Sequence, residues 1–303
     1  MFSEPDDSAV RDRMHAAFTD AATRLTCAPV FGTPEAWGHG GRTLGMPVED
    51  AHGRAWLRVM EAPAGKAGGK LWVGTKTAAA VLSDEIPRPR LLRSAEWKGH
   101  EYAYRAELSS YVPEPPCSPS PDLTERIALP DTWWFQLRRA CDVVAATPVP
   151  DGRQPVVTQD YIHRTIPRYL GETGLDTTVQ RWGLAHGDLH WANLTGPELT
   201  ILDWEGFGPA PHGFDAAHLH AYTLPVPETA AQVRKTFLNV LDTPDGRLAE
   251  ITVAAILLQA ADRDPVHARL APHVRAHVRH LLSTSHHHGL GSPQGSAGLR
   301  PEG

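Results

Sequence analysis

Three polar residues near the middle of the chain have the types and the spacing that phosphoryl transfer requires. Asp188 precedes Asn193 by five residues, and Asp203 follows after a short segment. One carboxylate can accept the proton of an attacking hydroxyl, while an amide oxygen and a second carboxylate can hold the metal that bridges nucleotide phosphates. The pattern predicts Asp188 as the catalytic base, and Asn193 and Asp203 as ligands of Mg²⁺, which prefers oxygen ligands.

The segment between these residues predicts how the chain would bring them together. Residues 195–197, Thr-Gly-Pro, are typical of a turn, and residues 199–202, Leu-Thr-Ile-Leu, are typical of a short strand. We therefore expect a hairpin that carries Asp203 to the side of Asn193.

The same stretch leaves two other interpretations open. His186, Asp188 and His190 alternate along the chain, so on a strand they would share one face and could ligate zinc, as in a hydrolase. Further histidines follow at positions 212, 218 and 220, but no ordered set of three ligands stands out. The other interpretation is a surface turn that happens to be rich in His, Asp and Asn.

Length and composition are those of an ordinary globular protein. A chain of 303 residues can build two lobes with separate cores, and 41% of its residues are hydrophobic. The net charge of −6 argues against a general nucleic-acid binder. Three scattered cysteines favour a reducing, cytoplasmic environment. Residues 1–25 lack the apolar core of a signal peptide, and no apolar run is long enough to span a bilayer, so we expect no membrane partner.

Hydrophobic periodicity predicts a β-rich region followed by a helical one. In the first region we expect helices over 6–25 and 71–82, and strands over 55–60, 91–92 and 101–108. In the second region we expect helices over 132–144, 160–170, 228–241, 247–262 and 265–283. A Pro/Ser-rich stretch separates the two regions.

These elements divide the chain into four parts. We expect an N-terminal helix and a β-rich nucleotide-binding lobe over residues 1–112, and a linker over 113–121. A helical catalytic and substrate lobe should follow over 122–284. The Gly/Ser/His-rich tail over 285–303 has the composition of a disordered segment.

The sequence HGDLHWANL at 186–194, followed by LDWEGFG at 202–208, resembles the catalytic and metal-binding motifs of the aminoglycoside phosphotransferase and choline kinase group. The resemblance implies an α+β, protein-kinase-like fold with a small antiparallel lobe and a larger, mainly helical lobe. It also implies an enzyme that moves the γ-phosphoryl group of ATP, with GTP as an alternative, to a hydroxyl of a small metabolite or antibiotic. By the same resemblance, His186 supports the catalytic loop, and Asp215 caps the next helix and braces that loop.

The N-terminal lobe departs from this family pattern. Arg58 stands where a kinase usually has a phosphate-binding Lys, and the helix predicted over 71–82 has no acid at the place of its usual Glu partner. A second hypothesis is therefore a nucleotide- or ligand-binding module with impaired catalysis.

Four residues of this lobe are expected near the nucleotide by position. The glycine-dense segment that contains Gly38, Gly40 and Gly41 could cover the phosphates with its backbone N–H groups. Glu107 begins the segment that would form the hinge beside adenine.

Acidic residues in the predicted helical lobe favour an amine-bearing acceptor. The acids expected to line the acceptor cleft are Asp160, Glu172, Glu205, Asp215, Glu228 and Asp262. On the last predicted helix, His273, His277 and His280 share one face, which we interpret as a solvated basic surface rather than a zinc site. The sequence does not predict the oligomeric state.

Overall fold

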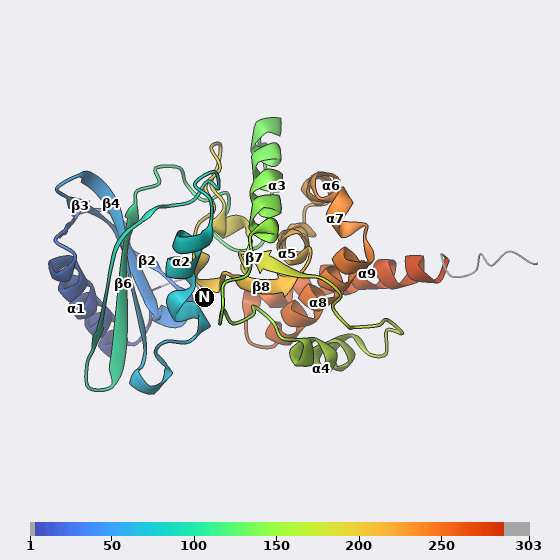
Figure 1. Cartoon of the computed structure of the whole chain (residues 1–303), viewed down its shortest axis with the longest axis horizontal. Helices are drawn as coiled ribbons and strands as arrows, with labels where there is room; N and C mark the ends of the chain where they lie inside the picture. The colour runs from blue at the N-terminus through green and yellow to red at the C-terminus, as the bar shows by residue number, and fades with distance from the viewer. Residues whose placement is uncertain (1–3, 288–303) are drawn as a thin grey trace, which may run out of the picture.

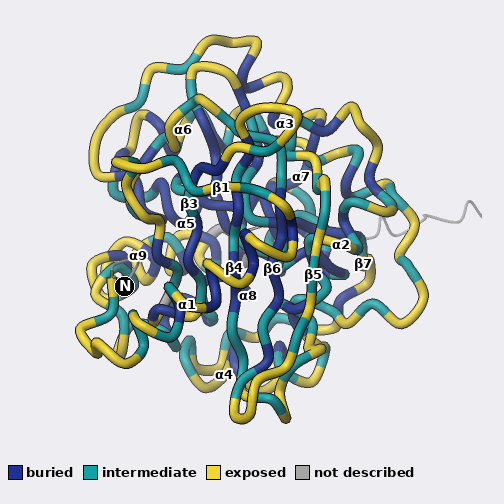
Figure 2. The backbone as a smooth tube through the Cα atoms, turned by 90° about the vertical axis from the view of Figure 1, so that its left-hand side faces the viewer, coloured by how far each residue is buried: buried dark blue, intermediate teal, exposed yellow. Residues whose placement is uncertain are grey.

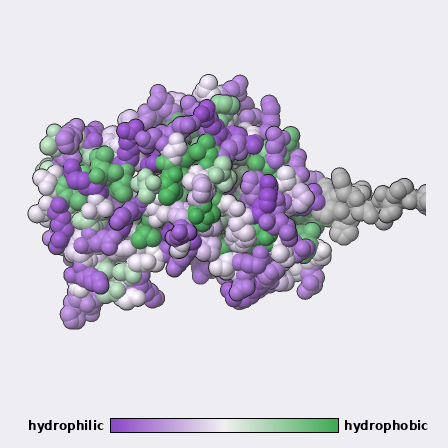
Figure 3. Space-filling model, viewed as in Figure 1, coloured by the Kyte–Doolittle hydropathy of each residue, from purple (hydrophilic) through white to green (hydrophobic). Residues whose placement is uncertain are grey.

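The computed structural model describes residues 4–287 and has two lobes, with the sheet of one beside the helices of the other (Figure 1). The lower outline of the molecule is indented between the two lobes (Figure 3). The predicted α+β fold, with an antiparallel β lobe before a helical lobe, is confirmed.

The sheet of the small lobe is antiparallel throughout. Its order is β1-β3-β4-β6-β5, and β2 pairs with one end of β3. The strands are β1 (Ala28–Pro29), β2 (Ala36–Trp37), β3 (Thr43–Asp50), β4 (Gly53–Pro63), β5 (Leu91–Lys98) and β6 (Tyr102–Ser110). The central position of β4 buries Leu57 and Val59 while it directs Arg58 to the other face of the sheet.

Helix α1 (Ser8–Arg24) covers the outer face of this sheet (Figures 1 and 2). The Asp7 side chain accepts a hydrogen bond from the backbone N–H of Ala9, which satisfies one free donor at the start of the helix. Met14 and Phe18 then pack on the buried strand residues, so the small lobe has a core of its own.

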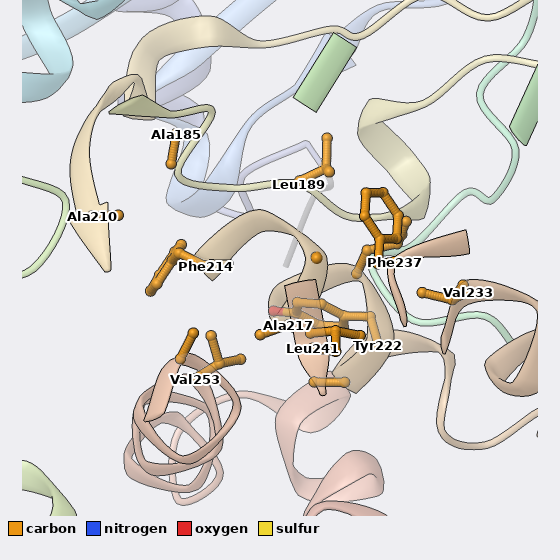
Figure 4. Close-up of a cluster of buried hydrophobic side chains, with 14 of the residues drawn as sticks. Ala185, Leu189, Ala210, Phe214, Ala217, Tyr222, Val233, Phe237, Leu241 and Val253 are labelled. Carbon is orange, nitrogen blue, oxygen red and sulfur yellow. The ribbon is translucent and has the colours of Figure 1, made fainter. Parts of the chain in front are cut away.

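The large lobe surrounds a second core that is formed mainly by helices. Its helices are α3 (Asp131–Ala146), α4 (Gln159–Leu170), α5 (Phe214–Thr223), α6 (Pro227–Thr236), α7 (Leu238–Leu241), α8 (Pro244–Ala260) and α9 (Pro265–His287). A two-stranded antiparallel sheet of β7 (Trp182–Ala185) and β8 (Gly208–Pro211) lies at the edge of this lobe that faces the larger sheet. Phe214 and Tyr222 of α5 lie among the buried side chains of Figure 4, which fixes the helix that follows the catalytic segment.

Helix α2 (Lys70–Val81) belongs to the small lobe in sequence but packs against the large one. Ala78, Leu82 and Ile86 are buried in the core of the large lobe. A Cβ atom on Gly74 would lie 1.9 Å from the backbone oxygen of Glu205. Only glycine allows this approach, so the backbone of α2 rests directly on the segment that follows Asp203.

Two predicted elements differ from the structure. The helix expected over 228–241 is broken at Phe237, whose φ of −107° and ψ of 22° separate α6 from α7. The side chain of Phe237 is buried, so its packing overrides the helical periodicity. The strand expected over 91–92 extends to Lys98 because its residues alternate in exposure.

The prediction of a disordered tail from residue 285 is wrong for residues 285–287, because α9 continues to His287. The rest of the predicted tail lies outside the described residues.

The prediction that three histidines of α9 form a solvated face is wrong for one of them. His273 and His280 are exposed, whereas the Nε2 atom of His277 lies 2.8 Å from the buried Glu250 carboxylate. His220 and Arg234 also contact that carboxylate, at 3.2 and 2.9 Å. The periodicity placed the histidines on one face correctly, but it could not show that α8 packs against part of that face.

Candidate active site

The predicted catalytic loop follows strand β7, and the side chain of Asp215 binds its backbone. The carboxylate of Asp215, in the first turn of α5, accepts hydrogen bonds from the backbone N–H groups of His186 and Gly187 at 2.7 and 3.0 Å. Gly187 has a φ of 86°, a conformation that favours glycine. Burial raises the pKa of Asp215, and the two backbone donors partly offset that rise.

His186 uses both of its ring nitrogens inside the protein. Its Nδ1 accepts from the backbone N–H of Asp188 at 3.2 Å, and its Nε2 donates to the carbonyl oxygen of Leu202 at 2.7 Å. Burial lowers the pKa of His186, which favours this neutral form. No lone pair is left for a metal, so the arrangement does not fit a zinc site built from His186, Asp188 and His190.

The hairpin after the loop brings Asn193 and Asp203 together in the way that the sequence predicts. The Asn193 Nδ2 group donates to the carbonyl oxygen of Asp188 at 2.9 Å. The backbone N–H of Leu202 donates to the carbonyl oxygen of Asn193 at 2.8 Å. Asp203 has a φ of 56° and a ψ of 70°, a left-handed conformation that costs a non-glycine residue about 1–3 kcal/mol. This backbone conformation directs the Asp203 carboxylate into the space between the lobes.

The two proposed metal ligands fit Mg²⁺ in their chemistry. The amide nitrogen of Asn193 is a donor within the loop, so its oxygen is the atom that remains for a cation. The Oδ1 atom of Asp203 is buried and accepts no hydrogen bond from any described residue. One neutral and one charged oxygen form a hard-ligand set of the kind that Mg²⁺ prefers.

Arg58 has an acidic partner, but that partner comes from the large lobe and not from helix α2. Its Nη2 atom lies 2.5 Å from a carboxylate oxygen of Glu205, and its Nη1 atom lies 3.2 Å from Oδ1 of Asp203. Burial alone would lower the pKa of Arg58, but the two carboxylates more than offset it and raise that pKa. The expectation that Arg58 lacks an acidic partner is therefore wrong.

The sequence contains a local signal for the pairing of Glu205 with Arg58, but Glu205 is not among the residues predicted for the nucleotide site. Glu205 follows Asp203 by two residues, and the tight turn over Trp204–Gly206 brings both carboxylates to Arg58. Burial raises the pKa of Glu205, and Arg58 acts in the opposite direction.

The proposed nucleotide-binding residues are only partly brought together. Gly38 lines both cavities between the lobes, whereas Gly40 and Gly41 line neither. Gly41 instead packs against Pro5. Glu107 lines the smaller cavity, of about 420 Å³, and its buried carboxylate accepts a hydrogen bond from Arg105 at 2.8 Å.

Asp188 faces the larger cavity, which has a volume of about 1070 Å³ and also contains Asp203 and Arg58 in its lining. The Nε2 atom of His190 lies 3.4 Å from Oδ2 of Asp188. Burial raises the pKa of Asp188, but the contact with His190 outweighs it and lowers that pKa below its usual range. Lys70 lines the same cavity and donates a hydrogen bond to the carbonyl oxygen of Val156 at 2.8 Å.

Similar folds occur among solved structures. No protein-family model matches the chain, and no curated protein sequence matches it. A thermostable mutant of the aminoglycoside phosphotransferase APH(4)-Ia, in its apo form, aligns over 84% of this chain and 95% of its own, with 14% identity and a TM-score of 0.54.

Two further structures have lower TM-scores. The spectinomycin phosphotransferase APH(9)-Ia, in complex with ADP and spectinomycin, covers 86% of this chain and 93% of its own at 10% identity, with a TM-score of 0.45. An ethanolamine kinase from Plasmodium vivax covers 83% and 82% at 12% identity, with a TM-score of 0.41.

The chain therefore has the two-lobe, protein-kinase-like fold of the aminoglycoside phosphotransferases, which confirms the predicted resemblance at the level of the fold. None of the helices within residues 4–287 combines the length and the apolar character that a membrane crossing needs.

Proposed function

We propose that this protein is a small-molecule kinase that transfers the γ-phosphoryl group of ATP, with GTP as an alternative, to a hydroxyl group. The observation that supports this proposal most strongly is the convergence of Asp188, Asn193 and Asp203 at the junction of two cavities between the lobes. Phosphoryl transfer depends mainly on positioning and charge, and this convergence supplies both.

In this proposal Asp188 accepts the proton of the acceptor hydroxyl. The hydroxyl oxygen then forms a bond to the γ-phosphorus, the bond from that phosphorus to the bridging oxygen breaks, and ADP leaves. The ionised carboxylate of Asp188 is the form that can accept this proton. Arg58 and Lys70 line the same cavity and would supply cations for the phosphates.

Asn193 and Asp203 would hold Mg²⁺, which offsets the charge of the phosphates when it is bound. His186 and Asp215 would act as supports of the loop, because their contacts are with its backbone. Gly38 would lie beside the phosphates and Glu107 beside the base, in the smaller cavity. We propose lobe boundaries at residues 112 and 122, with the linker between them.

A binding module without catalysis is the second candidate, and one observation favours it. The guanidinium of Arg58 lies 3.2 Å from the Asp203 oxygen that the metal would need, so an internal cation competes for that ligand. If this contact persisted with nucleotide bound, nucleotide would bind with little dependence on Mg²⁺ and no transfer would follow.

Titration of a fluorescent ATP analogue with and without Mg²⁺ separates the two candidates. For a kinase, Mg²⁺ strengthens binding of the analogue, Asp203→Asn removes that gain, and Asp188→Asn leaves it intact. ATP turnover should fall in both variants. Mg²⁺-independent binding, with equal ATP turnover in wild type and Asp188→Asn, would support the binding module instead.

A further inference from the structure

The part of the larger cavity beyond Asp188 is built by helices of the large lobe. Tyr161 of α4, Tyr222 of α5, Leu257 of α8 and Val266 of α9 line it on different sides. If the proposed function is correct, this is the space for the acceptor, because the nucleotide side is marked by Arg58 and Lys70. The chemistry of this wall therefore indicates the class of acceptor.

The acids expected to favour an amine do not form this wall. Glu205 is the only one of the six that lines the cavity, and it is paired with Arg58. Asp215 binds the backbone of the catalytic loop. The other four, which are exposed at the surface, are Asp160, Glu172, Glu228 and Asp262. The premise for an amine-bearing acceptor is therefore wrong.

One other acid, Asp264, lines the acceptor wall, and one of its two carboxylate oxygens is engaged by contacts within the protein. Its Oδ1 atom accepts hydrogen bonds from the backbone N–H groups of Val266 and His267, at 2.8 and 3.3 Å, and so caps α9. The same oxygen lies 3.1 Å from the Nδ1 atom of His267. An ammonium group in the cavity would have to compete with these three contacts.

Three other polar side chains of the wall have hydrogen-bond partners within the protein. The Tyr222 hydroxyl lies 2.8 Å from Nε2 of His267, and the Tyr161 hydroxyl is bonded to the side chain of Gln259. His218 bonds through Nδ1 to the carbonyl oxygen of Leu189 at 3.2 Å. Burial lowers the pKa of His218 to about 4, so its ring is neutral near pH 7.

We infer that the acceptor is an uncharged alcohol carried on an apolar or aromatic framework, and not an amine-bearing compound. Aromatic and aliphatic side chains cover such a framework, and Asp188 is left free to receive the hydroxyl proton. A cation would have to share the Asp264 carboxylate with its contacts to the start of α9, or would pair with Asp188 and block the base.

Two pairs of alcohols that differ only in charge test this inference. Choline is compared with its carbon isostere 3,3-dimethyl-1-butanol, and phenylalaninol with 2-methyl-3-phenyl-1-propanol. Binding to the full chain is measured by ligand-observed NMR, with no dependence on turnover. We expect each neutral member to bind at least about tenfold more tightly, which corresponds to about 1.4 kcal/mol. Equal or tighter binding of the amines, or no binding by either neutral alcohol, would overturn the inference.

A carboxylate added to the wall provides a gain-of-function test. Val266→Asp, in the first turn of α9 where an acid is tolerated, should narrow or reverse the preference for the neutral member. Ala268→Asp is the matched control, because Ala268 lies on the same helix and does not line the cavity. If both variants changed the preference equally, the wall would not be the determinant.

The same alcohols distinguish this inference from the proposed function. Transfer of ³²P from labelled Mg-ATP to the neutral alcohols supports both. Preferential binding of the neutral alcohols without any transfer supports the acceptor class and contradicts the proposed kinase activity. Transfer to the amines alone contradicts the acceptor class and supports the kinase activity.

Discussion

Replacing Glu205 by Gln tests whether the ion pair with Arg58 joins the two lobes. The substitution keeps the shape of the side chain and removes its charge. The two side chains are only 18% and 21% exposed, and they lie 2.5 Å apart. Removing one partner of a fully buried ion pair costs about 3–5 kcal/mol. Asp203 remains 3.2 Å from Arg58 and about a fifth of each side chain reaches solvent, so we expect a smaller loss of about 1–3 kcal/mol.

A surface pair of the same residue types provides the control. Arg139 and Glu85 lie 2.6 Å apart, but their side chains are 61% and 58% exposed. Exposed pairs contribute about 0–1 kcal/mol, so Glu85→Gln should be nearly neutral. The free energy of unfolding is measured by urea denaturation, and a double-mutant cycle with Arg58→Met gives the coupling between the partners. Two results would refute a bridging role for the ion pair. One is a Glu205→Gln variant that is no less stable than Glu85→Gln, and the other is a double-mutant cycle that shows no coupling energy between the partners.

Three other outcomes are expected. Asp188→Asn should lower turnover by about 10²–10⁴-fold, as measured by ADP release, and an unchanged rate would exclude Asp188 as the base. Asp215→Asn should lower the free energy of unfolding by about 1–3 kcal/mol, because the backbone N–H groups of His186 and Gly187 lose a charged acceptor; urea denaturation measures this loss, and an unchanged midpoint would contradict it. Because the folded-state pKa of His218 is depressed to about 4, the unfolded chain binds its proton first, so stability should fall as pH drops from about 6.5 to about 4. His218→Gln should flatten that pH dependence in urea denaturation, and a slope identical to that of the wild type would show that His218 is not the titrating group.

The sequence predicted the hairpin between Asn193 and Asp203 well, because its signal is local. Asp188, Asn193 and Asp203 are joined by a hairpin whose turn residues and short strand can be read directly from the chain. Helices α1, α3 and α4 were predicted for a similar reason, since one apolar face repeats at helical spacing in each.

The features that were missed depend on contacts between distant segments. Glu205 reaches Arg58 across 147 positions, and no periodicity reports such a pairing. The count of acids in the large lobe suggested a cationic acceptor, but a count does not show that Asp215 binds a backbone or that Asp160 faces solvent. Gly40 and Gly41 were linked to phosphate because glycines are common in such loops, whereas here their positive φ angles form a turn outside the cavities.

The contact of Gly74 with Glu205 has a mechanical consequence for the cleft. Because the backbone of α2 already touches the segment after Asp203, and Ala78 and Leu82 are buried in the other core, this helix is anchored to the large lobe. Domain closure that carried α2 along with the sheet would have to break that packing. Trp72 of α2 is also buried against Met60 and Ala103 of the sheet, so the helix is held by both lobes and movement of the sheet over it would break this second packing. The segment after Asp203 therefore contacts the small-lobe part of the chain at two points, through Gly74 of α2 and through Arg58 of β4.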